Sequence, residues 1–170
     1  MYLLLVILRM VHILAGAFWV GAALMLTFFI SPTVNATQDA GKRFMGHFMG
    51  KTKFNLFMWS SALLTVIAGS ILYWFDSSGF RSVWMNSGPG MGYGISAIFA
   101  FIGLGVGVFQ NRTSNALAVL GAQVQAQGTP PSPEQVAQLQ NINKALAIGG
   151  KLNAIALVLA TIGMAIARYL

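Results

Sequence analysis

The chain predicts an all-α fold, a four-helix transmembrane bundle. Of its 170 residues, 56% are apolar and 8% are charged, whereas ordinary soluble domains carry about 25% charged residues. Four segments have the length and composition of membrane spans, which need roughly 20 apolar residues: 3–30, 54–75, 91–109 and 152–169. Backbone groups in lipid must be hydrogen-bonded internally, so we expect helices. We also expect one integral membrane domain, residues 1–170.

The first segment carries two ionisable residues, Arg9 and His12, deep in an apolar run. Ionisable groups at membrane depth are costly and usually functional. We expect this segment to be retained as a helix, because it is longer than the apolar core of a signal peptide, which is roughly 7–15 residues. Pro32 predicts that the helix ends at Ser31.

One face of the first helix combines polar, small and aromatic residues at spacings of three and four. These residues are Arg9, His12, Gly16, Trp19 and Ala23. Residues at such spacings lie on the same helix face. We therefore expect this face, with both ionisable side chains, to point into the bundle and not at lipid.

The basic residues predict the orientation of the chain. Most of them lie between segments one and two or between segments three and four: Lys42, Arg43, Lys51, Lys53, Arg112, Lys144 and Lys151. The positive-inside rule then places these connections in the cytoplasm and both termini outside, as expected for a bacterial inner membrane. The net charge of +7 is thus explained by topology, and we expect the lipid bilayer, not nucleic acid, as the partner.

Residues 35–53 separate the first two segments. Phe44, Met45, Phe48 and Met49 recur there at helical spacing among basic residues. This pattern predicts either an interfacial helix or a cytoplasmic extension of the second helix. Residues 76–92, which are rich in Gly and Ser, predict the outer loop.

The last two segments each present a face of small residues, which lets membrane helices approach closely. These faces are Ser96, Ala100, Gly103 and Gly107 in the third segment, and Gly149, Asn153, Ala156, Ala160, Gly163 and Ala167 in the fourth. We expect the two helices to contact other helices closely through these faces. One arrangement that we consider is that helices three and four pack against each other.

Residues 111–150 predict a helical hairpin that extends helices three and four into the cytoplasm. Ser132 has the residue type of a helix N-cap, Pro133 follows at the first helical position, and Gln135 stands at the third. At ~1.5 Å per residue, a helix from Pro133 to the C-terminus is far longer than a ~30 Å hydrocarbon core. The uncharged, Gln-rich hairpin is either a docking surface or a solvated stalk.

His12 is the strongest candidate for a cofactor ligand. An imidazole inside a membrane helix is suited to bind the iron of haem b or a copper ion. In this hypothesis Gly16 leaves room for the macrocycle, Trp19 packs on its edge, and Arg9 meets a propionate. Alternatively, His12 forms a hydrogen bond to a neighbouring helix, and Arg9 extends to the outer surface.

A second candidate metal site is Met45, His47 and Met49, because thioether and imidazole groups suit Cu(I). On a regular helix, however, Met45 and Met49 lie on one face and His47 on another. The chain has no cysteine, which excludes thiolate ligands and cysteine nucleophiles. The carboxylates Asp39, Asp76 and Glu134 all lie outside the spans or at a helix start, which disfavours a carboxylate proton relay and a hydrolase.

Residues 11–21, with the sequence VHILAGAFWVG, resemble the first-helix motif of the copper-resistance D (CopD-like) membrane proteins. That motif is a His followed about two turns later by Trp-x-Gly. The same stretch resembles the first helix of the HemJ-like protoporphyrinogen oxidases, which are small haem-associated membrane proteins. The resemblance implies copper uptake or haem binding, and it carries over to His12, Trp19 and Gly21.

Three functional hypotheses follow from the sequence. The first is a membrane protein that binds haem b at His12 and has an electron-transfer or accessory role. The second is a copper-handling permease, and the third is a structural subunit without a cofactor. In each case we expect a homo-oligomer or a larger membrane complex, and an enzymatic activity is left open.

Overall fold

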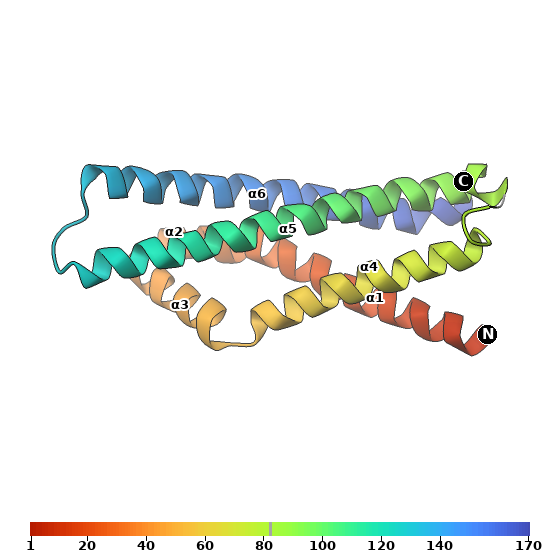
Figure 1. Cartoon of the computed structure of the whole chain (residues 1–170), viewed down its shortest axis with the longest axis horizontal. Coiled ribbons are helices and arrows are strands. Elements are labelled where there is room, and N and C mark those ends of the chain that lie inside the picture. Colours follow the sequence, from red (N-terminus) through yellow and green to blue (C-terminus); the bar gives the residue numbers. More distant parts are fainter. Residues whose placement is uncertain (82) are drawn as a thin grey trace.

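The computed structural model describes residues 1–81 and 83–170, and every regular element in these two ranges is a helix (Figure 1). The α-helices are α1 (Tyr2–Met25), α2 (Ser31–Ala36), α3 (Gln38–Lys51), α4 (Phe54–Asp76), α5 (Gly88–Ala126) and α6 (Pro133–Ile166). A π-helical turn (Leu26–Ile30) joins α1 to α2, and short 3-10 turns cover Val83–Asn86 and Ala167–Tyr169.

Four helical stretches of this fold are long and apolar enough to cross a membrane: Tyr2–Ala36, Phe54–Asp76, Gly88–Ala126 and Pro133–Tyr169. Many large apolar side chains on them are exposed, among them Ile13, Ile67 and Ile98. Exposed apolar surface on this scale is expected for helices that face lipid. The chain is therefore an all-α integral membrane protein, and this part of the sequence prediction is confirmed.

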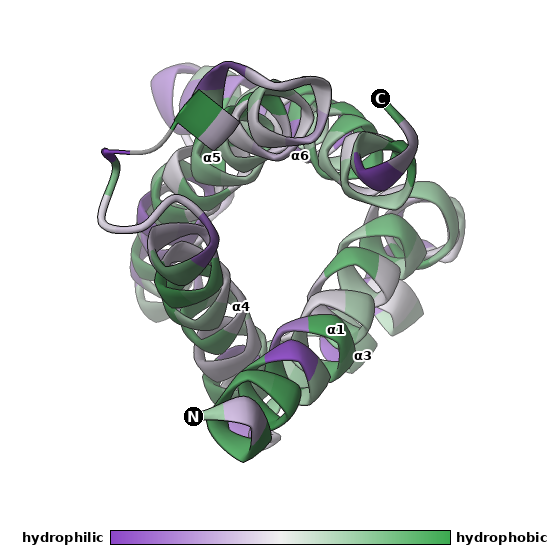
Figure 2. Ribbon diagram, turned by 90° about the vertical axis from the view of Figure 1, so that its right-hand side faces the viewer, coloured by the Kyte–Doolittle hydropathy of each residue, from purple (hydrophilic) through white to green (hydrophobic). Residues whose placement is uncertain are grey.

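The helices form two antiparallel pairs, α1 with α4 and α5 with α6, and these pairs have the most extensive contacts between helices. Figure 1 shows both termini at one end of the molecule and the α5–α6 connection at the other. Seen along the long axis, the helices surround a common centre and carry hydrophobic residues along their lengths (Figure 2). All four meet in one apolar cluster: Trp19, Ala23, Ala62 and Leu157, with Val20, Met58, Val66 and Leu104 packed against it.

The α5–α6 pair is held by its small residues. A Cβ atom added to Gly103 would lie 2.7 Å from Leu157, and one added to Gly163 would collide with Ser96. Real side chains cannot approach so closely, so glycine at these positions permits the helices to pack. The predicted small-residue faces thus do contact each other, although Gly107 has open space around it.

The ends of the α5–α6 pair follow local sequence signals. The Ser132 hydroxyl accepts a hydrogen bond from the Gln135 amide N–H, and the Gln135 side chain accepts one from the Ser132 N–H at 2.9 Å, which is a complete capping box. At the other end α5 begins at Gly88, earlier than residue 91, because the Ser87 hydroxyl caps it by accepting from the Gly90 N–H. The outer loop is therefore shorter than the predicted range, residues 76–92.

The expectation that Pro32 ends the first helix is wrong. The chain remains helical to Ala36, with the π-helical turn Leu26–Ile30 directly before the proline. Proline cannot donate a backbone hydrogen bond and collides with the carbonyl four residues earlier. A π-helical turn widens the helix locally and so accommodates it. Thr27 in this turn also donates a hydrogen bond to the Gly150 carbonyl oxygen of α6 at 3.3 Å.

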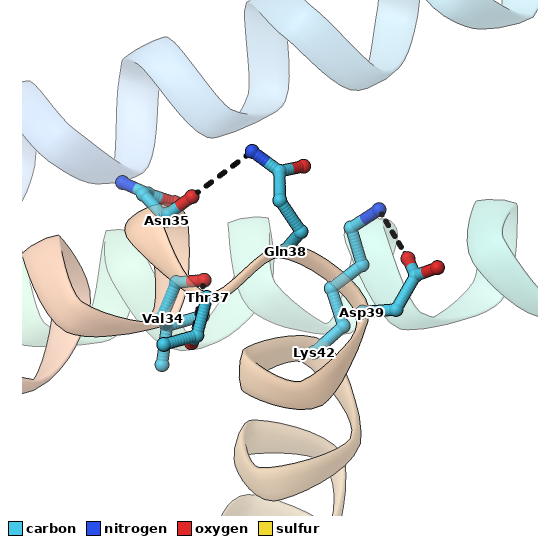
Figure 3. A network of polar contacts seen from close by, with 6 residues as sticks. All are labelled: Val34, Asn35, Thr37, Gln38, Asp39 and Lys42. Atoms are coloured by element: carbon cyan, nitrogen blue, oxygen red, sulfur yellow. Dashed lines mark hydrogen bonds and ion pairs between the residues drawn. The ribbon is translucent and has the colours of Figure 1, made fainter.

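α3 is a separate helix and not an extension of α4, because the helix breaks at Thr52, whose backbone is extended. A sharp corner joins α2 to α3. Gln38 takes a positive φ of 50° at this corner, and its side chain donates to the Asn35 carbonyl oxygen (Figure 3). The corner folds the first turn of α3 back onto the end of α2. Gly41 is buried there, and a Cβ atom on it would collide with the backbone of Val34.

We predict that Gly41→Ala destabilises the protein by about 1 kcal/mol or more, because backbone at a tight corner cannot move aside for a methyl group. Gly46→Ala, in the same helix, has nothing within 4 Å of the added carbon. It should be neutral or slightly stabilising, since alanine favours helix over glycine by about 1 kcal/mol. Thermal unfolding in detergent measures both variants, and equal melting temperatures would contradict the prediction.

Candidate functional site

The candidate site centres on His12, which lies where α1 packs against α4. Its Nδ1 atom is 2.8 Å from the main-chain carbonyl oxygen of Thr65. A carbonyl oxygen can only accept, so Nδ1 carries the proton and donates it to this bond. The neutral imidazole then has its remaining lone pair on Nε2, which is the arrangement found in histidines that bind a metal.

Two glycines bring α1 and α4 close enough for this bond. A Cβ atom on Gly69 would lie 2.7 Å from Cε1 and 2.8 Å from Nδ1 of His12, so the imidazole rests directly on the glycine backbone. One turn along α1, Gly16 faces Thr65, whose methyl group would lie 3.3 Å from an added Cβ atom. The Thr65 hydroxyl donates to the Ser61 carbonyl oxygen at 2.7 Å, and the Thr65 carbonyl oxygen has two lone pairs, so it can accept from His12 as well as within the helix.

The structure divides the predicted face of α1 into parts with different surroundings. His12 and Gly16 are half-buried against α4, while Trp19 and Ala23 are buried in the four-helix cluster. The Arg9 side chain is exposed, so the expectation that both ionisable residues point into the bundle holds for His12 only. Arg9 lies one turn nearer the N-terminus, where α1 has diverged from α5 and α6 (Figure 1).

Met45, His47 and Met49 all lie in the regular helix α3. His47 is exposed, Met45 is half-buried and Met49 is 40% exposed. Residues two apart in a helix point in different directions, so His47 does not share a face with either methionine. Among the residues that the structure describes, no group of three or more His, Cys, Asp or Glu side chains is placed to hold a metal ion.

Asn153 is a polar residue that the sequence analysis placed only on a small-residue face. It is 6% exposed, and its side-chain oxygen has no hydrogen-bond partner in the described part of the chain. That oxygen lies 3.2 Å from the position of a Cβ atom on Gly103. Only the packing of α6 against α5 shows that this amide is buried, and no sequence signal identified it.

The fold and this site define the class of protein: a polytopic α-helical membrane protein with one histidine held between two of its helices. Comparisons with protein-family models, with curated proteins and with solved structures found no match to this chain.

We predict that Gly69→Ala displaces the His12 ring and breaks its bond to Thr65. Leaving the imidazole without a partner costs about 1–3 kcal/mol, and forcing the ring aside adds an overpacking cost of about 1–3 kcal/mol. Together these exceed the helix-propensity gain from alanine, which is about 1 kcal/mol. Gly105→Ala is the matched control, because it is also helical and has nothing within 4 Å of the added carbon. In thermal unfolding, the melting temperature of Gly69→Ala should lie below that of wild type, and that of Gly105→Ala at or above it. The reverse order would contradict the packing of His12 on Gly69.

We also predict that Asn153→Leu raises the stability of the protein. A buried acceptor without a partner costs about 1–3 kcal/mol, and an apolar side chain of similar size removes that cost. The measurement is denaturation in mixed micelles, with Asn55→Leu, at an exposed position of α4, as the control. A marked loss of stability in Asn153→Leu alone would show that the amide has a partner in the folded protein.

Proposed function

We propose that the protein is a membrane protein that binds a redox cofactor, haem b, through Nε2 of His12, with an electron-transfer or accessory role. The single observation that supports it most is the hydrogen bond from His12 Nδ1 to the Thr65 carbonyl oxygen. This bond fixes the tautomer with the lone pair on Nε2 and holds the ring in one orientation. Both are required of an axial ligand.

The surroundings of His12 correct the expected role of Gly16. The space beside Gly16 is taken up by Thr65 and that beside Gly69 by the imidazole itself, so the two glycines hold the ring in place and do not leave room for the macrocycle. Arg9 lies one helical turn before His12, and its guanidinium forms no ion pair within the described residues. It would hold a propionate. Trp19 packs in the four-helix cluster two turns away from His12. In this proposal it stabilises the helices that hold the site and does not contact the cofactor.

Haem b, when bound, supplies one-electron redox chemistry within the membrane. The protein's own contribution is to hold the imidazole, to keep its Nδ1 proton on a main-chain acceptor, and to surround the site with apolar side chains. A strong hydrogen bond from Nδ1 raises the basicity of the ligand and so favours the oxidised metal. Copper at the same imidazole is the alternative occupant.

We further propose that the protein lies in a bacterial inner membrane with both termini outside. The positive-inside rule supports this, because the end of the molecule opposite the termini (Figure 1) bears most of the basic residues. In this orientation residues 111–150, at the end of the α5–α6 pair that is far from the termini, form a cytoplasmic hairpin. The two termini lie at the other end of the molecule, the same-side placement that four spans require.

The second candidate function is a structural subunit that binds no cofactor. The same hydrogen bond favours it, since a bond between His12 and Thr65 is a sufficient reason for a histidine in this helix. The long α5–α6 pair would then present its Gln-rich end to another subunit of a membrane complex or to a second copy. A variant that keeps the bond but has no Nε2 separates the two functions.

We predict that His12→Asn retains the fold and loses the cofactor. The asparagine amide nitrogen lies close to the position of Nδ1 and can donate to Thr65, but it offers no nitrogen ligand to iron. Detergent-purified wild type should show a Soret band and a reduced α-band, absent from both His12→Asn and His12→Ala. His12→Asn should also melt within a few degrees of wild type.

The control for this experiment is His47→Asn, which removes the exposed histidine of α3 and should leave the spectrum unchanged. Iron and copper analysis of the same samples identifies the metal, so that stoichiometric copper without a Soret band would assign the site to copper. A colourless, metal-free wild type that stays colourless after addition of haem would contradict cofactor binding and favour the structural subunit.

A further inference from the structure

The helix α3 combines features that the proposed function does not use. It is amphipathic: Phe44, Met45, Phe48 and Met49 lie on one side of the helix, and Arg43, His47 and Lys51, at intervals of four, form a basic stripe beside it. Arg43 and His47 point away from the apolar side, and Lys51 lies at its edge. Phe44 is 52% exposed and Met49 is 40% exposed. Met45 and Phe48 are half-buried, so the apolar side of α3 is partly uncovered by the rest of the chain.

The position of α3 explains why this side is partly uncovered. Within the described residues, α3 packs on α2 and on the start of α4, and it does not join the four-helix cluster. The corner at Gln38 turns it away from the direction of α1 (Figures 1 and 3). Phe48 stacks between Phe44 and Phe54, with ring centroids 5.6 and 4.5 Å apart, and so fixes α3 to the beginning of α4.

The charge of the basic stripe on α3 is not neutralised by the protein. Asp39 is the one acidic residue of this helix, and it pairs with Lys42 at 3.3 Å. Arg43 and Lys51 form no ion pair within residues 1–81 and 83–170. The chain has ten basic residues and three acidic ones, and the other two acids, Asp76 and Glu134, lie in other helices. These exposed basic side chains are therefore free to bind an anionic group from outside the chain.

We infer that α3 lies in the membrane interface and binds anionic phospholipid through Arg43, His47 and Lys51. An exposed apolar side next to an unpaired basic side is the pattern of a helix that lies in the headgroup region with its apolar residues among the acyl chains. The helix begins where one span ends and finishes where the next begins, so it is held at the bilayer surface. A phospholipid offers a phosphate to the basic side chains of α3 and acyl chains to its apolar side chains. A soluble anion offers only the first of these contacts.

The first experiment measures which lipids stay with the protein. Full-length protein is placed in nanodiscs made from equal parts of phosphatidylcholine and phosphatidylglycerol, and retained lipid is counted by native mass spectrometry. Wild type should retain phosphatidylglycerol preferentially. Since each basic residue near an anionic surface contributes about 1 kcal/mol, the double variant Arg43→Gln/Lys51→Gln should reduce this preference by roughly fivefold for each charge removed.

The matched control is Arg81→Gln/Arg168→Gln, which removes the same charge at the opposite end of the bundle (Figure 1). It should leave the preference for phosphatidylglycerol near the wild-type value. An equal loss in the two double variants would overturn the assignment to α3, because the effect would then follow net charge alone. Binding of inorganic phosphate in pure phosphatidylcholine discs, lost in the α3 variant, would likewise overturn a lipid ligand.

A second measurement tests the depth of the helix independently of lipid type. The chain has no cysteine, so a nitroxide label can be attached to Met49→Cys on the apolar side or to His47→Cys, which lies two residues away and points in a different direction. The label at position 49 should be relaxed more by oxygen, which concentrates in lipid, and the label at position 47 more by a water-soluble nickel chelate. Equal access of the nickel chelate to both positions would overturn the interfacial placement.

Discussion

The close approach of helices through glycine is the constraint on which the rest of this structure depends. In a bilayer the lipid tails are as apolar as leucine, so burying apolar side chains does little to hold helices together. Here each pair of helices closes at positions where a Cβ atom would meet the neighbouring helix: Gly16 and Gly69 between α1 and α4, and Gly103 and Gly163 between α5 and α6. Van der Waals contact at these points then replaces the hydrophobic effect.

The same constraint creates the candidate site. His12 can reach the Thr65 carbonyl oxygen only because Gly69 leaves space for the ring. A polar group at this depth would otherwise be unpaired, at a cost of a few kcal/mol. One hydrogen bond therefore satisfies the imidazole, locks α1 to α4, and leaves Nε2 as the one ring atom with a free lone pair. The structural and the cofactor-binding hypotheses share this bond and differ only in what Nε2 meets.

The end of the molecule with α2 and α3 is shaped by the backbone and not by close contact between long helices. There the chain leaves the apolar region, and its geometry is set by backbone features: a π-helical turn before Pro32, a positive φ at Gln38 and a buried Gly41. These features turn α3 away from the bundle and keep its apolar side partly uncovered. An amphipathic helix in such a position is most stable where water and acyl chains meet, which links the corner to the proposed lipid contact.

The sequence by itself determined the class of fold, the approximate spans and the helix ends that carry strong local signals. Composition is sufficient for the spans, because the bilayer imposes helices on any long apolar segment. The start of α6 was equally predictable, since Ser132 and Gln135 form their capping box within one turn of chain. Local signals also marked His12 as a candidate site residue, since it is an ionisable group in an apolar run.

Only the tertiary structure decided which group His12 contacts and which polar groups are buried. The partner of His12 is a main-chain carbonyl, and no side-chain pattern reports that a particular carbonyl will be near. Arg9 follows the same periodicity as His12 but is exposed, because α1 diverges from the other helices at that point, and this depends on helix crossing. The continuation past Pro32 and the burial of Asn153 have the same origin: a π-helical turn and a helix pairing are cooperative results of packing, not properties of a local stretch of sequence.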